Sequence, residues 1–198
     1  MKTLLVTGGI GSGKSAVCSL LEERGIPVYD SDSAAKRLYD TDPDLVRDLE
    51  ALFGTPLRQA DGRFDRRKLA GLLFSDPEKL AALEAVVHPA VLRDFQAWRS
   101  RQQAPFVVIE SAIALEKPLF DAAYDAVLLV TAPDAMRLER ACRRDGSEPA
   151  AVLARMRRQH FDLSRVDAVV NNDLDMATLR HRTDIAIKIL SLQLLPTA

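Results

Sequence analysis

Short, nearly continuous apolar stretches recur along the chain and alternate with longer segments of helical periodicity. Each stretch is rich in β-branched residues and is followed by polar or turn-forming residues, which is typical of strands buried on both faces. The stretches occupy residues 3–7, 27–29, 106–109, 126–131 and 168–170. Because helical segments lie between them, the pattern predicts an α/β fold in which helices cover both faces of a parallel sheet.

Helix signals are clear at both ends of the chain. We expect the first helix to begin in a glycine-rich loop near Gly13 and to run to Arg24, with Gly25 as the residue that stops it. The last helix, around residues 179–195, has a dense apolar face and is expected to pack on the sheet.

The gap between the second and third strands is too long for a plain connection, so residues 34–104 should form a helical insertion. Asp42 and Asp76 each precede a proline, the pattern of a helix N-cap followed by proline at the first helical position. Gly54 is expected to end the first of these helices. Pro89, which follows His88, is expected to end or redirect the second.

Residues 133–165 have the pattern of two helices that are broken at 145–147 and rich in arginine. Such a run is either a solvated helix face or a surface that binds phosphate. A segment that buries little apolar surface opens at low free-energy cost, as a lid must. We therefore assign residues 145–165 to a lid and the remaining parts of the sheet domain to a core. The core comprises residues 1–33, 105–144 and 166–198.

Composition narrows the class of protein. With 27 basic and 28 acidic residues among 198, the net charge of −1 creates no global positive field that would attract nucleic acid. The two cysteines, Cys18 and Cys142, lack neighbours at metal-ligand spacing, which favours a reducing, cytoplasmic location. No apolar run approaches the roughly 20 residues of a membrane helix, and the N-terminal stretch lacks a signal-peptide cleavage site. We expect neither export nor a membrane partner.

The strongest chemical signal is the segment 8–15, which satisfies G-x-x-x-x-G-K-[ST] directly after a strand and before a helix. In such a P-loop, backbone N–H groups and the helix N-terminus surround phosphate oxygens. Lys14 should reach the β- and γ-phosphates of ATP, and the Ser15 hydroxyl should bind Mg²⁺. The motif predicts a P-loop NTPase-type core. We assign ATP binding to Gly8, Gly9, Ile10, Gly11, Ser12, Gly13, Lys14, Ser15 and Ala16.

Two carboxylates, Asp30 and Asp32, follow the second strand, where open α/β sheets collect their ligands. Alternate residues of a strand share a face, so both carboxylates should point toward the γ-phosphate. There they would accept the proton of a substrate hydroxyl or hold Mg²⁺ through water. The alternative is a turn or an N-cap for a helix near Ala34. The neighbouring P-loop favours the chemical role.

Several further motifs occur in a characteristic order along the chain. They are residues 8–15, 29–32, 86–89, Arg140 with 144–145, 155–159 and Asn172. In order and approximate spacing this set resembles the dephospho-coenzyme A kinase family over nearly the whole chain. The resemblance implies transfer of the γ-phosphate of ATP to the ribose 3′-hydroxyl of dephospho-coenzyme A, with Mg²⁺ as cofactor. It also implies that residues 34–104 bind the coenzyme A substrate.

Site residues follow from the same resemblance. It implies that Asp32 is the catalytic base, that Asp30 assists it, and that Arg140 stabilises charge on the transferring phosphoryl group. Asn172 would lie near the adenine. His88 would contact the acceptor.

The chain departs from the family's pattern at two places. After the third strand the usual acid and Pro-Leu-Leu-Glu become Glu110-Ser111-Ala112-Ile113-Ala114-Leu115-Glu116. By resemblance, Glu110 or Asp30 would hold Mg²⁺ through water, and Glu116 would contact the substrate. The family's Asn-x-Gly becomes Asn172-Asp173-Leu174.

Other functions remain open at this point. One alternative is another small P-loop kinase, for a nucleoside monophosphate or a small polyol, and Arg58, Arg63, Arg66 and Arg67 could then grip an acceptor phosphate. A nucleotide-operated switch is disfavoured because no N-K-x-D guanine element follows, and an inactive domain is disfavoured by the intact Lys14, Ser15 and Asp32. We expect a monomer or a weak homo-oligomer.

Overall fold

The computed structural model describes residues 1–74 and 76–195. The chain divides into two compact units, one formed by Met1–Asp30 together with the chain from Arg101 onward, the other by Ser31–Ser100. The first unit contains the sheet and the second is helical. Within the described residues, no helix has both the length and the apolar character needed to cross a membrane.

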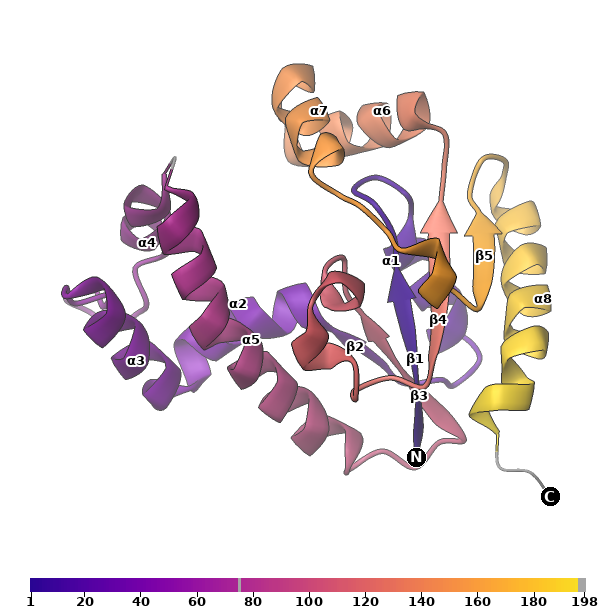
Figure 1. Ribbon diagram of the computed structural model, residues 1–198, viewed down its shortest axis with the longest axis horizontal. Helices are drawn as coiled ribbons and strands as arrows, with labels where there is room; N and C mark the ends of the chain where they lie inside the picture. The colour runs from indigo at the N-terminus through magenta and orange to yellow at the C-terminus, as the bar shows by residue number, and fades with distance from the viewer. Residues whose placement is uncertain (75, 196–198) are drawn as a thin grey trace. The chain divides into compact units, whose positions relative to one another are not determined.

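The sheet of the first unit has five strands, all parallel, in the order β2-β3-β1-β4-β5 (Figure 1). The predicted α/β class with a parallel five-stranded sheet is confirmed. The predicted strand positions are correct to within one residue at each end. The strands are β1 (Lys2–Thr7), β2 (Val28–Asp30), β3 (Phe106–Glu110), β4 (Ala126–Thr131) and β5 (Ala168–Asn171).

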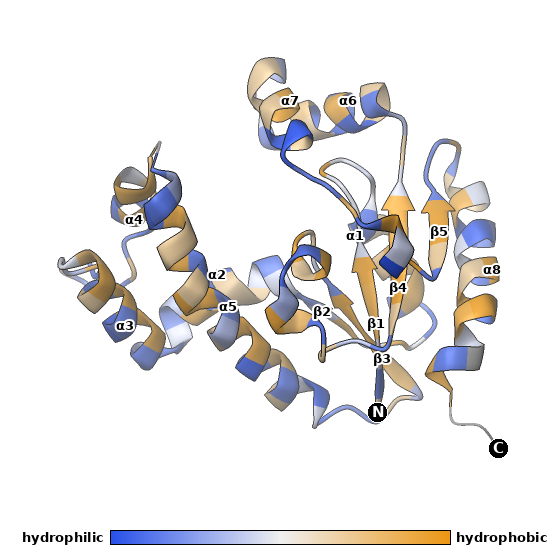
Figure 2. Cartoon of the chain, in the orientation of Figure 1, coloured by the Kyte–Doolittle hydropathy of each residue, from blue (hydrophilic) through white to orange (hydrophobic). Residues whose placement is uncertain are grey.

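Helices cover the sheet because the strands are apolar on both faces (Figure 2). Helices α1 and α8 contribute Val17, Leu21, Leu179 and Leu190 to the main core, against strand residues such as Leu128. The predicted first and last helices are thereby confirmed. The helices of this unit are α1 (Lys14–Glu22), α6 (Asp134–Asp145), α7 (Pro149–Arg157) and α8 (Met176–Leu194), with short 3-10 turns at Ala114–Glu116, Pro118–Phe120 and Leu163–Arg165.

The order of the strands decides which loops meet. Since all five strands are parallel, their carboxyl ends share one edge of the sheet, and β1 lies between β3 and β4. The glycine-rich loop therefore leaves the sheet at its centre, beside the segments that follow β3 and β4. Figure 1 shows α6 and α7 beyond this same edge. Ligands of open α/β sheets collect at such positions.

The second unit consists of helices whose ends follow the predicted cap signals. The side chain of Asp42 accepts hydrogen bonds from the N–H groups of Asp44 and Leu45, both at 3.0 Å, and Gly54 ends the helix with a φ of 62°. Asp76 likewise accepts from Lys79 N at 3.1 Å. The helices are α2 (Ser31–Thr41), α3 (Pro43–Phe53), α4 (Arg66–Leu73) and α5 (Pro77–Arg99).

One helix prediction is wrong. Pro89 does not end or redirect its helix, because α5 continues through it as a single element of 23 residues. A proline inside a helix costs about 3 kcal/mol. Burial of Leu83 and Val87 before it, and of Val91 and Phe95 after it, offsets that cost, since each buried side chain contributes about 1.5–3 kcal/mol.

Candidate active site

The segment 8–15 forms a loop between β1 and α1 whose shape depends on glycine. Gly8 and Gly13 have φ values of 152° and 95°, which L-residues with side chains rarely adopt. A Cβ atom on Gly8 would lie 2.2 Å from the carbonyl oxygen of Val130, and one on Gly13 would lie 2.0 Å from the side-chain nitrogen of Asn172. The end of β4 and the segment after β5 thus pack directly against the loop backbone.

Lys14 and Ser15 begin helix α1, so both lie at its positive N-terminal end. The Nζ atom of Lys14 donates to the carbonyl oxygen of Gly8 at 3.0 Å, so the lysine side chain folds back over the loop. The hydroxyl of Ser15 donates to Oε1 of Glu110 at 3.2 Å, so the end of β3 reaches the start of α1. These contacts bring together a cation, a hydroxyl and a carboxylate at one loop.

The carboxylates of Asp30 and Glu110 come from neighbouring strands, and the two residues are paired in register between β2 and β3. Burial raises the pKa of Glu110, with a smaller contribution from the nearby charge of Asp30, while Lys14 opposes the shift. A cation beside these oxygens would stabilise the ionised form of Glu110. Hydroxyl and carboxylate oxygens are the donors that Mg²⁺ prefers.

In the described part of the chain, no three His, Cys, Asp or Glu side chains are arranged to hold a metal ion by themselves. Mg²⁺ is usually bound through one or two carboxylates, directly or through water, and completes its coordination with water and phosphate. The Ser15 hydroxyl with Glu110 and Asp30 fits that requirement.

The structure corrects the expected placement of Asp32. Strand β2 ends at Asp30 and α2 begins at Ser31, so Asp32 lies in the first turn of a helix, not on the face of a strand. Residues of a helix turn by about 100° each, so the alternation that grouped the two acids does not apply. Asp30 belongs to the first unit and Asp32 to the second. Asp32 is exposed at the positive end of α2.

His88 lies in the interior of α5 and is half-buried. The second unit also has a hollow of about 460 Å³ lined by Asp40, Arg58, Asp61, Gly62, Arg63, Phe64 and Arg66.

Three arginines that could grip an acceptor phosphate are already engaged by the chain itself. Arg63 pairs with Asp61 at 2.7 Å, Arg66 pairs with Asp40 at 2.5 Å, and Arg58 donates to the carbonyl of Gly62 at 2.9 Å. Both ion pairs are exposed and contribute little to stability. These contacts therefore do not discriminate between a nucleoside monophosphate and another acceptor.

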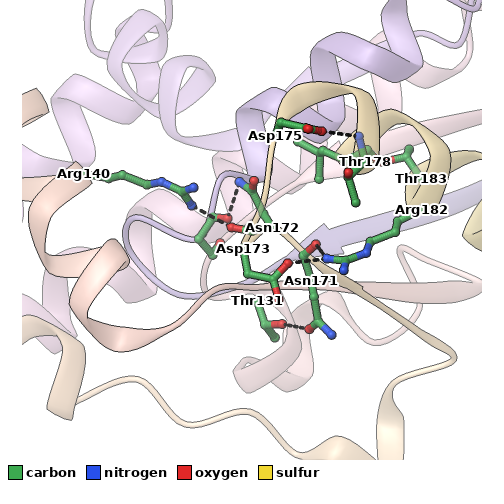
Figure 3. Close-up of polar contacts among 11 residues, drawn as sticks. Thr131, Arg140, Asn171, Asn172, Asp173, Asp175, Thr178, Arg182 and Thr183 are labelled. Carbon is green, nitrogen blue, oxygen red and sulfur yellow. Dashed lines mark hydrogen bonds and ion pairs between the residues drawn. The ribbon is translucent and has the colours of Figure 1, made fainter.

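Asn172 connects the end of β5 to the glycine-rich loop (Figure 3). Its buried side-chain amide donates to the carbonyl of Ser12 at 2.9 Å, and its own carbonyl accepts a hydrogen bond from Nη1 of Arg140 at 3.0 Å. Arg140 in α6 and the loop after β5 are thereby held against the turn at Ser12 and Gly13. The sequence predicted both residues for this site, but not the chain of contacts between them.

The loop that lacks the family's glycine is held by side chains instead. Arg182 of α8 donates to the carbonyl of Asn171 at 2.6 Å and pairs with Asp173, while Asp175 caps α8 by accepting from Thr178 N at 2.8 Å (Figure 3). Leu174 is exposed between them. The substitution therefore leaves a defined loop conformation in which Asn172 still reaches the glycine-rich loop.

Glu116 lies beside the segment that follows α7. Its Oε1 accepts from the backbone N–H of His160 at 3.2 Å, and Arg165 further along donates to the carbonyl of Leu115 at 2.8 Å. The segment after α7 is thus attached to the turn after β3.

Sequence reasoning gave no individual role to Arg137 or Gln159. Arg137 was one member of an arginine run, and Gln159 one member of a motif. In the structure both contact Ile10 at the tip of the glycine-rich loop. The composition of the run gives no signal that separates Arg137 from its neighbours, because the contact depends on how α6 packs.

Comparisons with known proteins agree over most of the chain. A sequence model described as dephospho-CoA kinase matches residues 3–178. The dephospho-CoA kinase of Porphyromonas gingivalis is 42% identical over 168 residues, covering 85% of this chain and 82% of the relative. That of Thermus thermophilus is 45% identical over 154 residues, covering 78% of this chain and 73% of the relative.

Solved structures support the fold. The crystal structure of TT1252 from Thermus thermophilus has a TM-score of 0.80 at 38% identity and covers 94% of this chain and 96% of its own. Dephospho-CoA kinase from Campylobacter jejuni has a TM-score of 0.60 at 22% identity, with coverages of 94% and 96%, and shows likeness of fold alone. On the extent and identity of the sequence matches, this chain belongs to the dephospho-CoA kinase family.

Proposed function

We propose that this protein transfers the γ-phosphate of ATP to the ribose 3′-hydroxyl of dephospho-coenzyme A, giving coenzyme A and ADP. The observation that carries this proposal is the family match over residues 3–178, which includes the loop where Lys14, Ser15 and Glu110 meet. The loop explains how a nucleoside triphosphate would be bound as the phosphoryl donor. Family membership specifies dephospho-coenzyme A as the acceptor.

The loop's N–H groups and Lys14 would bind the phosphates, with the N-terminus of α1 adding positive potential. Ser15 would hold Mg²⁺, with Glu110 or Asp30 acting through water. When bound, the ion neutralises charge on the phosphate oxygens. Arg140 would add positive charge beside the transferring group, and Asn172 would border the adenine. Asn172 contacts Ser12 of the loop, and Arg140 contacts Asn172.

Asp32 is the proposed base. It would accept the proton of the 3′-hydroxyl as that oxygen bonds to the γ-phosphorus, and the bond from phosphorus to the bridging oxygen of ADP would break. Asp30 would support it, while His88 and Glu116 would contact the acceptor. The helical unit would bind the coenzyme A portion, and residues 145–165 would act as a lid.

A lid function is supported by the small apolar surface that α6 and α7 bury. Their own core is limited to Ala141, Val152 and Met156, with partly buried neighbours that include Ile10. Few buried contacts make local opening inexpensive.

A coupled ADP-release assay tests the substrate. Dephospho-coenzyme A should support turnover with ATP and Mg²⁺, while AMP, CMP and adenosine at the same concentration should support little. The proposed base serves a sugar hydroxyl and not the already anionic phosphate of AMP or CMP. Adenosine has the hydroxyl but lacks the coenzyme A portion that the helical unit would bind. Turnover only with a monophosphate would assign the protein to the alternative class of kinase.

Arginine chemistry gives a second test. Arg140→Lys should not restore the activity that Arg140→Ala loses, because an ammonium group cannot replace the planar fork of a guanidinium. Arg143→Lys is the matched control on the same helix, since its side chain is 76% exposed and pairs only loosely with Glu139 at 3.7 Å. Steady-state rates of the variants should differ clearly. Equal losses at both positions would mean that the run acts as a general basic surface.

A further inference from the structure

Ile10 lies at the tip of the glycine-rich loop, and both of its backbone polar groups are hydrogen-bonded to side chains from other segments. The N–H of Ile10 donates to Oε1 of Gln159 at 2.8 Å, and the carbonyl of Ile10 accepts from Nε of Arg137 at 3.1 Å. The Ile10 side chain packs against the small apolar cluster that includes Ala141 and Val152. The backbone N–H, the carbonyl and the side chain of Ile10 therefore all contact α6, α7 or the segment after α7.

Arg137 is oriented for this contact by its own helix. Its Nη1 pairs with Asp134 one turn earlier at 2.9 Å, and its Nη2 lies 3.4 Å from the same Gln159 oxygen that accepts from Ile10. Only 16% of the Arg137 side chain is exposed, whereas Asp134 is 82% exposed. A guanidinium with three acceptors around it is fixed in direction as well as in place.

Two glycines of the loop leave the space that Arg137 fills. A Cβ atom on Gly9 would lie 2.0 Å from Nη2 of Arg137, and one on Gly11 would lie 2.2 Å from the Arg137 carbonyl oxygen. Gly9 is not among the glycines with positive φ, so its backbone conformation does not require glycine. A Cβ atom at this position would require the Arg137 guanidinium to move.

We infer that Arg137 is a positioning residue that joins helix α6 to the tip of the glycine-rich loop and thereby sets the loop geometry for the triphosphate. Arg140, one turn later, holds the opposite turn of the loop through Asn172. From one helix, Arg137 thus holds Ile10 of the loop directly and Arg140 holds Ser12 through Asn172. This inference rests on the proposed use of ATP, but not on the identity of the acceptor.

Calorimetry with ATP and Mg²⁺ separates a positioning role from a general structural one. Arg137→Ala should weaken ATP binding about tenfold or more, because it removes a charge-assisted hydrogen bond to the loop backbone. Dephospho-coenzyme A affinity and kcat at saturating ATP should change less than about threefold. Arg143→Ala on the same helix should leave both affinities unchanged. Unchanged ATP affinity in Arg137→Ala, or equal weakening of both substrates, would overturn the inference.

A double-mutant cycle tests the pairing with Gly9. Gly9→Ala should displace the Arg137 guanidinium and weaken ATP binding about as much as Arg137→Ala does. The double variant should then be little worse than either single one, because both changes break the same contact. Gly11→Ala is the control, since it meets the Arg137 backbone, which Arg137→Ala leaves in place. Losses for Gly9→Ala and Arg137→Ala that simply add would show that Gly9 acts independently of Arg137, against the inference.

Discussion

Asp32→Asn should lower kcat roughly 100-fold or more while ATP and dephospho-coenzyme A still bind within a few-fold, the usual scale for loss of a general base. Asparagine keeps the shape of aspartate but cannot accept the hydroxyl proton. A loss confined to kcat marks an interaction made in the transition state. Calorimetry of both substrates beside steady-state rates measures the two effects separately. Normal turnover by Asp32→Asn would show that Asp32 is not the base. Positioning of the phosphates would then have to explain catalysis alone.

The position of Asp32 calls for a stability control. An acid in the first turn of a helix stabilises it by about 0.3–1 kcal/mol through the helix dipole, and Asp32 occupies that place in α2. Asp44→Asn makes the same change in the first turn of α3, in the same unit. Both variants should show similar small shifts of Tm, and only Asp32→Asn should lose turnover. Asp30→Asn should cost less activity, because Asp30 has a supporting role.

Lys14→Ala should lower turnover roughly 100- to 1000-fold, the range seen when one group that stabilises developing charge is removed. The Lys14 side chain extends over the loop to Gly8 O and not into the apolar core. The Tm of the free protein should therefore change little. Ser15→Ala should also reduce turnover heavily, because its hydroxyl lies beside Glu110, where Mg²⁺ is expected.

Lys188→Ala is the matched control for Lys14→Ala, since Lys188 is an exposed lysine of α8 away from the loop. It should retain full activity. Thermal unfolding without ligand decides between the two roles of Lys14. If Lys14→Ala loses stability in proportion to its activity, the residue is structural and the phosphate assignment fails.

Local signals predicted much of the fold because they act over a few residues. Apolar, β-branched runs predicted all five strands, and the N-cap role of Asp42 and Asp76 followed from their side chains and the prolines beside them. Gly54 ends its helix in the left-handed conformation that glycine adopts easily. Pro89 shows the limit of such rules, because packing on both sides of it outweighs a local penalty.

The placement of Asp32 failed for a related reason. Residue spacing predicts a shared face only when the element type is known, and the chain turns into α2 immediately after Asp30. A strand and a helix present the same two residues in different directions. Both that spacing and the family resemblance indicated the chemical role of Asp32, and only the resemblance still supports it.

The sequence by itself determined the alternation of strands and helices, the phosphate-binding motif at Gly8–Ser15 and the family to which the chain belongs. Each rests on residue types at short spacing. Only the tertiary structure decided that Arg137 holds Ile10 and that Asn172 holds Ser12, contacts that join residues 127 and 160 positions apart. Such contacts depend on strand order and helix packing, which bring distant segments to one edge of the sheet. No local pattern in the chain distinguishes Arg137 from the other arginines of its run.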